Sequence, residues 1–188
     1  MVMAGRSGRP AFFLVRAAMR FDNRCDNTYY RRVRPTTLQA ELKQNKPFKS
    51  LKEEAHLSIQ RTAALLEHAF ESALKPHRIT ATQYNVLRIL RGSEPEGLCR
   101  NEIGARLVRQ VPDVTRLLDR LEDARLIARA RGGDDRRFVV TRITRAGLKL
   151  LDQVEHRIDE IHDEQLGHLD EPQLRKLISL LAVVRDRP

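Results

Sequence analysis

A segment in the middle of the chain carries side chains of the types that hold nucleic acid. In VPDVTRLLDRLEDARLI (111–127), Thr115, Arg116 and Arg120 are predicted to lie on the polar face of one helix. The planar guanidinium group of Arg can donate two parallel hydrogen bonds to a phosphate or to the edge of a guanine. This spacing therefore indicates a helix face that contacts DNA bases or phosphates.

A second basic feature follows in GGDDRRFVVTRITRAG (132–147), where a glycine-rich turn precedes a β-rich run. The glycines allow a narrow loop to approach a DNA backbone closely, and Arg136 and Arg137 stand beside the predicted tip. A guanidinium group there can enter the narrow, electronegative minor groove. We expect Asp135 either to orient one of the arginines through an ion pair or to act only as a turn-forming residue.

A simpler interpretation of the helix face is also open. Its two arginines can form ordinary surface ion pairs with the acidic residues around them, which are Asp113, Asp119 and Glu122. Two cationic projections in one unit favour DNA contact instead. The residues predicted to contact DNA are Pro112, Asp113, Thr115, Arg116, Asp119, Arg120, Arg136 and Arg137.

Hydrophobic periodicity predicts the elements that position these side chains. Apolar residues recur at spacings of three and four over 49–75, 79–90, 100–107 and 111–124, and again over 145–186. Residues 127–131 and 137–143 are strand-like and flank the glycine-rich turn. Three helices followed by strand, turn and strand are typical of a winged helix-turn-helix, whose third helix enters the major groove. The fold class is therefore predicted to be mainly α with a small β-wing.

The limits of these helices are predicted from their end signals. Thr80, Thr144 and Asp170 are expected to cap helix starts. Pro112 suits the first helical position, where no amide hydrogen is needed. The apolar stripe of this third helix, expected to face the core, consists of Val114, Leu117, Leu118 and Leu121.

Long helices flank the winged unit at both ends. Residues about 49–75 and about 145–186 carry broad apolar faces that a monomer of this size would leave exposed. Packing these faces against a second copy sets two recognition helices about 34 Å apart, one turn of DNA. An intramolecular helix bundle is the alternative. The sequence thus predicts N- and C-terminal dimerisation helices in a homodimer.

The charge of the chain is unevenly distributed. The net charge is +10; residues 1–36 contain eight Arg and two Asp, whereas residues 148–188 contain six basic and nine acidic residues. An excess of basic residues favours polyanions as partners. A general preference for Arg codons accounts for the abundance of Arg but not for its segregation. Residues 1–47 show no sustained periodicity, and so we expect a basic, disordered N-terminal extension there.

Other kinds of site have little support. His156, His162 and His168 are six residues apart, which places them on different faces of a helix, so no metal site is expected. Cys99 is expected to be a buried structural thiol rather than a redox switch. We recognise no catalytic pairing or cofactor motif, and so predict neither an enzyme nor a cofactor. Two cysteines without disulfide or metal spacing, and no apolar run long enough to span a membrane, predict a cytoplasmic protein without membrane contact.

Four stretches resemble the multiple-antibiotic-resistance regulator (MarR) family: ITATQYNVLRIL (79–90), VTRLLDRLE (114–122), DARLIAR (123–129) and DRRFVVTRITRAG (135–147). The resemblance covers about 49–186. It implies a homodimeric bacterial transcription factor, usually a repressor, that binds a palindromic operator and is often released by a small phenolic or other organic ligand. By position, Arg137 is the wing arginine, Arg136 stands beside it, and the recognition helix spans 111–124. Arg125 departs from the family, which usually has Gly there at the end of the helix.

The resemblance also suggests domain limits and a function. A MarR-type domain is expected at 48–188, with the winged helix-turn-helix at about 80–146 between the two dimerisation regions. The predicted function is sequence-specific binding of double-stranded DNA by a transcriptional regulator, a ligand-responsive repressor whose effector the sequence does not identify. A winged-helix protein-interaction module that does not bind DNA is the alternative.

Overall fold

The computed structural model describes residues 37–131 and 139–186, and the chain divides into two units, Met1–Pro47 and Phe48–Pro188. In the first unit, the described residues form one helical turn, α1 (Leu38–Glu41). The Thr37 hydroxyl group caps this turn by accepting a hydrogen bond from the Ala40 amide. Residues 38–41 thus form a local helix that the lack of periodicity did not predict.

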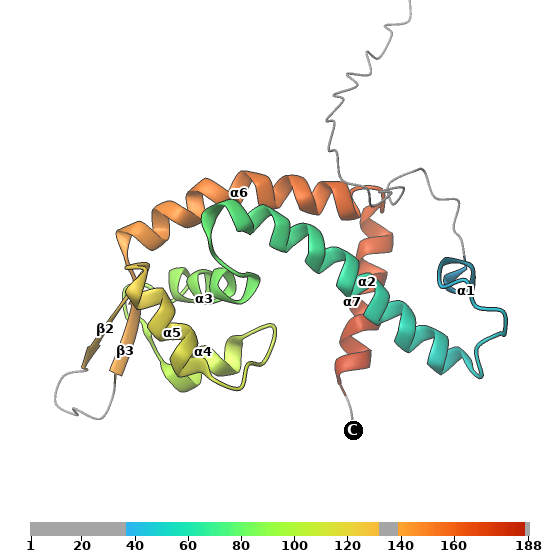
Figure 1. Cartoon of the computed structure of the whole chain (residues 1–188), viewed down its shortest axis with the longest axis horizontal. Coiled ribbons are helices and arrows are strands. Elements are labelled where there is room, and N and C mark those ends of the chain that lie inside the picture. Colours follow the sequence, from blue (N-terminus) through green and yellow to red (C-terminus); the bar gives the residue numbers. More distant parts are fainter. Residues whose placement is uncertain (1–36, 132–138, 187–188) are drawn as a thin grey trace, which may run out of the picture. The chain divides into compact units, whose positions relative to one another are not determined.

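The second unit contains the winged helix-turn-helix and the long flanking helices (Figure 1). Its elements in chain order are α2 (Leu51–Leu74), η2 (Lys75–His77), α3 (Ala81–Arg91), β1 (Leu98–Cys99), α4 (Arg100–Arg106), α5 (Val114–Asp123), β2 (Ile127–Arg131), β3 (Val139–Ile143), α6 (Arg145–Leu166) and α7 (Glu171–Arg185). This order confirms the predicted fold class, mainly α with a small β-wing.

Helix starts follow local capping rules. Three predicted caps are confirmed, each side chain accepting a hydrogen bond from the amide three residues on: Thr80, Thr144 and Asp170. The predicted start of α5 at 111 was wrong. The Asp113 carboxylate accepts a hydrogen bond from the Arg116 amide at 2.9 Å, which makes Asp113 the cap and leaves Pro112 outside the helix.

The wing is part of a three-stranded antiparallel sheet in the order β1-β3-β2. The sequence predicted β2 and β3 but not β1, a two-residue strand in which Leu98 pairs with Thr141. Gly97 precedes β1 with a φ of 74°, and a Cβ atom there would lie 2.6 Å from the Thr141 carbonyl oxygen. Glycine is therefore required where the chain enters the sheet.

The hydrophobic core lies where α3, α4, α5 and the sheet meet α6. Leu87 and Leu90 of α3, Ile103 of α4, and Leu118 and Leu121 of α5 are all buried. Val114 and Leu117 pack against the same core while partly exposed. The predicted stripe of α5 thus faces the core, and this packing leaves the opposite, polar face of the helix outward.

The start of α6 is joined to the end of α5. Thr144 donates its hydroxyl hydrogen to the Arg125 carbonyl oxygen at 2.8 Å, and its amide donates to the Leu126 carbonyl oxygen at 3.0 Å. In the first turn of α6, a Cβ atom at Gly147 would lie only 2.3 Å from that Leu126 oxygen. Glycine thus permits the close approach of α6 to the chain segment that follows α5.

The long helices expose apolar side chains. The C-terminal half of α2 lies against α6 (Figure 1), whereas Leu51 at the start of α2 is 84% exposed. On α7, Ile178 is 63% exposed and Val183 is 69% exposed, and no residue of this helix is buried. Within the described residues, no helix is long and apolar enough to cross a membrane. These faces therefore have the character of an unpartnered protein surface.

Candidate nucleic-acid interface

The polar face of α5 presents three of the predicted contact residues to solvent. Thr115, Arg116 and Arg120 are exposed, while Leu118 and Leu121 anchor the helix from behind. Among the described residues, no hydrogen bond or ion pair engages the guanidinium group of Arg116 or of Arg120. Both groups therefore keep all their donors available for an anionic partner.

The acidic residues around these arginines are bound elsewhere. Asp113 caps the helix, and the carboxylates of Asp119 and Glu122 both contact Arg129 of β2. The interpretation in which these acids form surface ion pairs with the arginines of α5 was therefore wrong. Arg129 lies on a strand, outside the helix, and binds both carboxylates. Spacing along a single helix does not predict such a contact.

Arg129 joins strand β2 to α5. Its guanidinium group lies 2.7 Å from Asp119 Oδ1, and its Nε donates to Glu122 Oε2 at 2.8 Å. The amide of Arg129 also donates to Glu122 Oε1 at 3.1 Å, so one carboxylate grips both backbone and side chain. These hydrogen bonds lower the pKa of Glu122, and the bonds that Arg129 donates to Glu122 and Asp119 raise the pKa of its guanidinium group.

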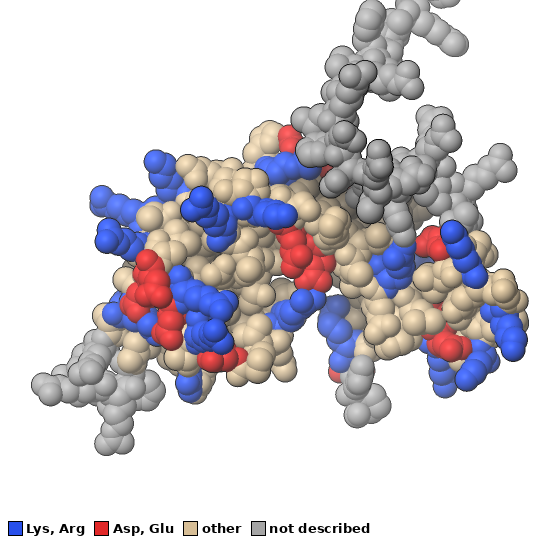
Figure 2. All heavy atoms as spheres, in the orientation of Figure 1, with Lys and Arg blue, Asp and Glu red and all other residues tan. Residues whose placement is uncertain are grey.

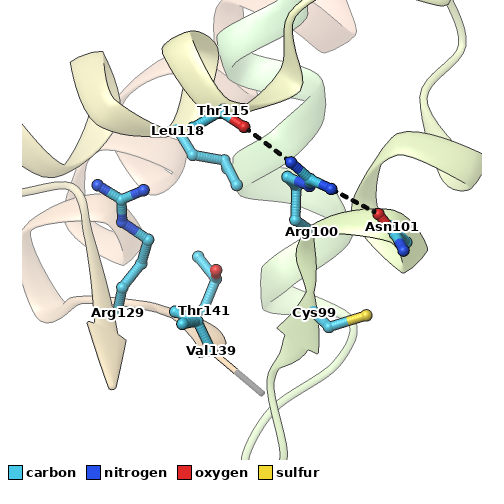
Figure 3. A pocket seen from close by; sticks show the side chains of 8 residues that line it. All are labelled: Cys99, Arg100, Asn101, Thr115, Leu118, Arg129, Val139 and Thr141. Atoms are coloured by element: carbon cyan, nitrogen blue, oxygen red, sulfur yellow. Dashed lines mark hydrogen bonds between the residues drawn. The ribbon is translucent and has the colours of Figure 1, made fainter. Parts of the chain in front are cut away.

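Arg100 contacts α5 from the other side. In Figure 3 its side chain extends from the start of α4 toward Thr115, to whose hydroxyl oxygen it donates a hydrogen bond of 3.2 Å. A hollow of about 370 Å³ lies between Arg100, Arg129, Thr141 and their neighbours. Sequence reasoning missed both Arg100 and Arg129 as parts of the site. Their basic character was visible, but which helix they approach depends on the tertiary fold.

The remaining predicted site residues have different positions. Pro112 is exposed just before α5. Arg136, Arg137 and Asp135, the predicted wing arginines and their orienting residue, lie outside the described residues. Over α5 and the adjoining end of α6, Figure 2 shows Lys and Arg side chains gathered, with Asp and Glu side chains beside those of α5. The site is thus a mixed-charge surface on which the two arginines of α5 remain unengaged by the described residues.

The cysteine and histidine residues occupy ordinary positions. Cys99 was predicted to be buried, but it is only half-buried, because it lies on the short edge strand β1. Its amide donates a hydrogen bond to Glu102, which lowers the pKa of that carboxyl group. His162 stacks on Phe70 of α2 with ring centroids 6.5 Å apart, and the described residues contain no group of three or more potential metal ligands.

Comparison with known proteins identifies relatives of this chain. Residues 79–139 match the model of the MarR family. The chain is 30% identical over 131 residues to the HTH-type transcriptional regulator FarR of Neisseria gonorrhoeae, an alignment that covers 68% of this chain and 88% of FarR.

Solved structures give the same result. A MarR transcription factor from Planctomyces limnophilus is 41% identical, with a TM-score of 0.57 over 73% of this chain and 99% of that one. A mutant MarR from E. coli complexed with operator DNA is 25% identical, with a TM-score of 0.62 over 69% of this chain and 91% of that one. With its winged helix-turn-helix and these relatives, the chain belongs to the MarR family of transcriptional regulators.

Proposed function

We propose that the chain is a homodimeric regulator that binds a palindromic operator in double-stranded DNA. The observation that carries this proposal is the outward face of α5. There, two guanidinium groups lack a partner among the described residues while the neighbouring carboxylates are occupied by Arg129 and by the helix start. The relation to MarR of E. coli, solved with operator DNA, supports the same function.

Within this proposal, α5 enters the major groove and the wing reaches the adjacent minor groove. Arg116 and Arg120 contact phosphates or guanine edges, and Thr115 adds a short polar contact. Arg136 and Arg137 serve the wing, with Asp135 orienting one of them. Asp113 and Asp119, which were also predicted to contact DNA, support α5 instead, because Asp113 caps the helix and Asp119 contacts Arg129. Pro112 stays a predicted DNA contact.

The second copy is expected to cover the exposed apolar faces of the flanking helices. Ile178 and Val183 of α7 and Leu51 of α2 are the kind of side chains that an obligate dimer buries. A two-fold dimer would place two α5 helices about one DNA turn apart, so that each reads one half-site. Residues 1–47 then form a basic extension that precedes the DNA-binding domain.

Regulation by a small molecule completes the proposal. We infer a repressor that releases DNA on binding a phenolic or other organic ligand, as membership of the family suggests. Regulation of transcription, rather than catalysis, is the activity, and a bacterial protein acting on an operator does so in the cytoplasm.

The test uses the purified full-length protein and the intergenic DNA beside its own gene. Arg116→Ala and Arg137→Ala are each expected to weaken binding roughly 10- to 100-fold, because each loses a contact with phosphate or base. Fluorescence anisotropy gives the affinity, and footprinting gives the protected sequence. Arg157→Ala is the matched control, since Arg157 lies on α6 and pairs with Glu160 and Glu164.

Two outcomes would count against the proposal. If both variants footprint with unchanged affinity, the assignment of α5 and the wing as the reading elements fails. If the unaltered protein binds no duplex but retains a protein partner in a pull-down, the protein-interaction module is the correct function.

A further inference from the structure

We propose that Arg129 is a positioning residue that keeps Arg116 free for DNA by holding the carboxylate of Asp119. The proposal rests on the proposed function and adds to it a role for a strand residue that does not itself need to reach the DNA.

Arg116 and Arg129 can compete for the carboxylate of Asp119 because of the residue spacing on α5. Asp119 is three residues after Arg116, a separation at which opposite charges on a helix surface pair readily. Such a pair would turn the Arg116 guanidinium along the helix axis and neutralise it. In the structure Asp119 Oδ1 lies 2.7 Å from the guanidinium group of Arg129, and Arg116 is left without an ion pair among the described residues.

Three features hold the Arg129 side chain in place beside Asp119. Its side chain is only 24% exposed, and its strand pairs with β3 over five residues from Ile127↔Ile143 to Arg131↔Val139. Glu122 grips Arg129 through both its amide and its guanidinium group. The planar guanidinium group of Arg129 is therefore pre-oriented, with donors left over for Asp119. A pair between Arg116 and Asp119 would have to order two mobile side chains on the helix surface, and so it is the weaker interaction.

In Figure 3 the Arg129 side chain extends from its strand toward α5. On the opposite side, Arg100 contacts Thr115 rather than an acidic residue. Of the strand arginines whose side chains are described, only Arg129 is ion-paired to α5, because Arg142 of β3 donates to the Pro95 carbonyl oxygen instead. Arg142 thus provides a matched control on the same sheet.

The experiment measures duplex affinity of the full-length protein over a series of salt concentrations. Arg129→Gln is expected to weaken binding about tenfold and to reduce the slope of log K against log [salt] by about one ion, because freed Asp119 neutralises Arg116. Adding Asp119→Asn to that variant is expected to restore both affinity and slope. Arg142→Gln is expected to bind within about twofold of the unaltered protein.

The double variant decides the mechanism. A residue that contacts DNA directly, or that only braces the wing, leaves the double variant as weak as Arg129→Gln alone, and that result would overturn the proposal. So would unaltered binding by Arg129→Gln. Failure of the unaltered protein to bind any duplex is a different outcome, since it rejects the proposed function instead.

A second variant keeps the test valid if Arg129→Gln does not fold, as judged by circular dichroism. Arg129→Lys retains the positive charge but offers a single ammonium group, which cannot hold both carboxylates in the planar geometry. It is expected to lose part of the affinity and to regain it with Asp119→Asn. Weaker binding that the second substitution does not relieve would again reject the proposed role.

Discussion

At the scale of single residues, the carboxylate of Glu122 joins α5 to strand β2 of the wing. Glu122 accepts hydrogen bonds from the amide and the side chain of Arg129, so it fixes the strand and its guanidinium group together. The pKa of Glu122 is lowered mainly because Arg129 donates to its ionised form. The folded protein therefore binds the ionised carboxylate in preference to the neutral acid.

The stability that Glu122 contributes should depend on pH. Because its pKa in the folded protein lies below the unfolded value of about 4.3, the contribution is complete above that pH and is lost as the pH falls through the lower, folded value. Glu122→Gln is expected to lower the free energy of unfolding by about 1 kcal/mol at pH 7, a modest value because solvent screens the partly exposed group. Urea unfolding at pH 7 and near pH 3 measures the difference.

A surface carboxylate provides the comparison. Glu96→Gln lies in the exposed turn before β1 and is expected to change stability little at either pH. Equal losses for Glu122→Gln at both pH values would show that the ionised form is not what the fold binds.

At the scale of elements, the recognition helix ends in an unusual residue. The Leu126 amide donates to the Leu121 carbonyl oxygen, and the Arg125 amide donates to that of Glu122, which is the Schellman pattern of a helix end. Arg125 has a φ of 59°, in the left-handed region that favours glycine. The backbone thus keeps the geometry of a glycine helix end, although the residue at this position is Arg125 rather than the usual Gly.

Arg125→Gly is expected to stabilise the protein by about 0.5 to 1 kcal/mol. Removing the side chain relieves the left-handed strain, although the greater freedom of glycine in the unfolded chain offsets part of the gain. Ala124→Gly is the control, because Ala124 has an ordinary right-handed φ of −75° and glycine should only destabilise it. Chemical denaturation measures both, and a loss of stability in Arg125→Gly would contradict the assignment of strain.

The elements show which kinds of structure the sequence could predict. Thr80, Thr144 and Asp170 were placed correctly because a cap is an interaction between residues three apart. At the start of α5, Pro112 and Asp113 gave adjacent and competing signals. The side-chain hydrogen bond of Asp113 sets the start, and so the proline rule placed the helix too early.

Long-range features were out of reach of such local rules. β1 is only two residues long and exists because Leu98 pairs with Thr141, more than forty positions later in the chain. In the candidate site, periodicity correctly placed Arg116 and Arg120 on the outward face of α5. It could not predict that Arg129 would take the acids of that helix, because this depends on how β2 crosses α5.

At the scale of the whole molecule, the apolar surface of α7 has a direct consequence for assembly. Ile178→Asp should place a charge in the proposed dimer interface and shift the protein to monomers, because an unpaired buried charge is strongly unfavourable. Operator affinity should fall about 100-fold or more, since two linked α5 helices bind far more tightly than one. Sedimentation velocity and anisotropy measure the two effects.

A control substitution on α7 distinguishes an effect on dimer assembly from an effect of net charge. Lys176→Glu alters the net charge by more than Ile178→Asp does but replaces a charged, exposed residue. It is expected to leave the dimer intact. A dimeric Ile178→Asp protein with normal operator affinity would place the interface on another surface.

The hydrogen bonds of Thr144 to Arg125 and Leu126 make the start of α6 a pivot. With 22 residues, α6 is a lever about 33 Å long, so a shift of about 3 Å at its far end turns it by only about 5° at the pivot. So small a rotation can leave the hydrogen bonds of Thr144 intact, and those bonds then carry the end of α5 with them. A rearrangement at the proposed dimer interface would thus reach α5 as a change of angle rather than of distance.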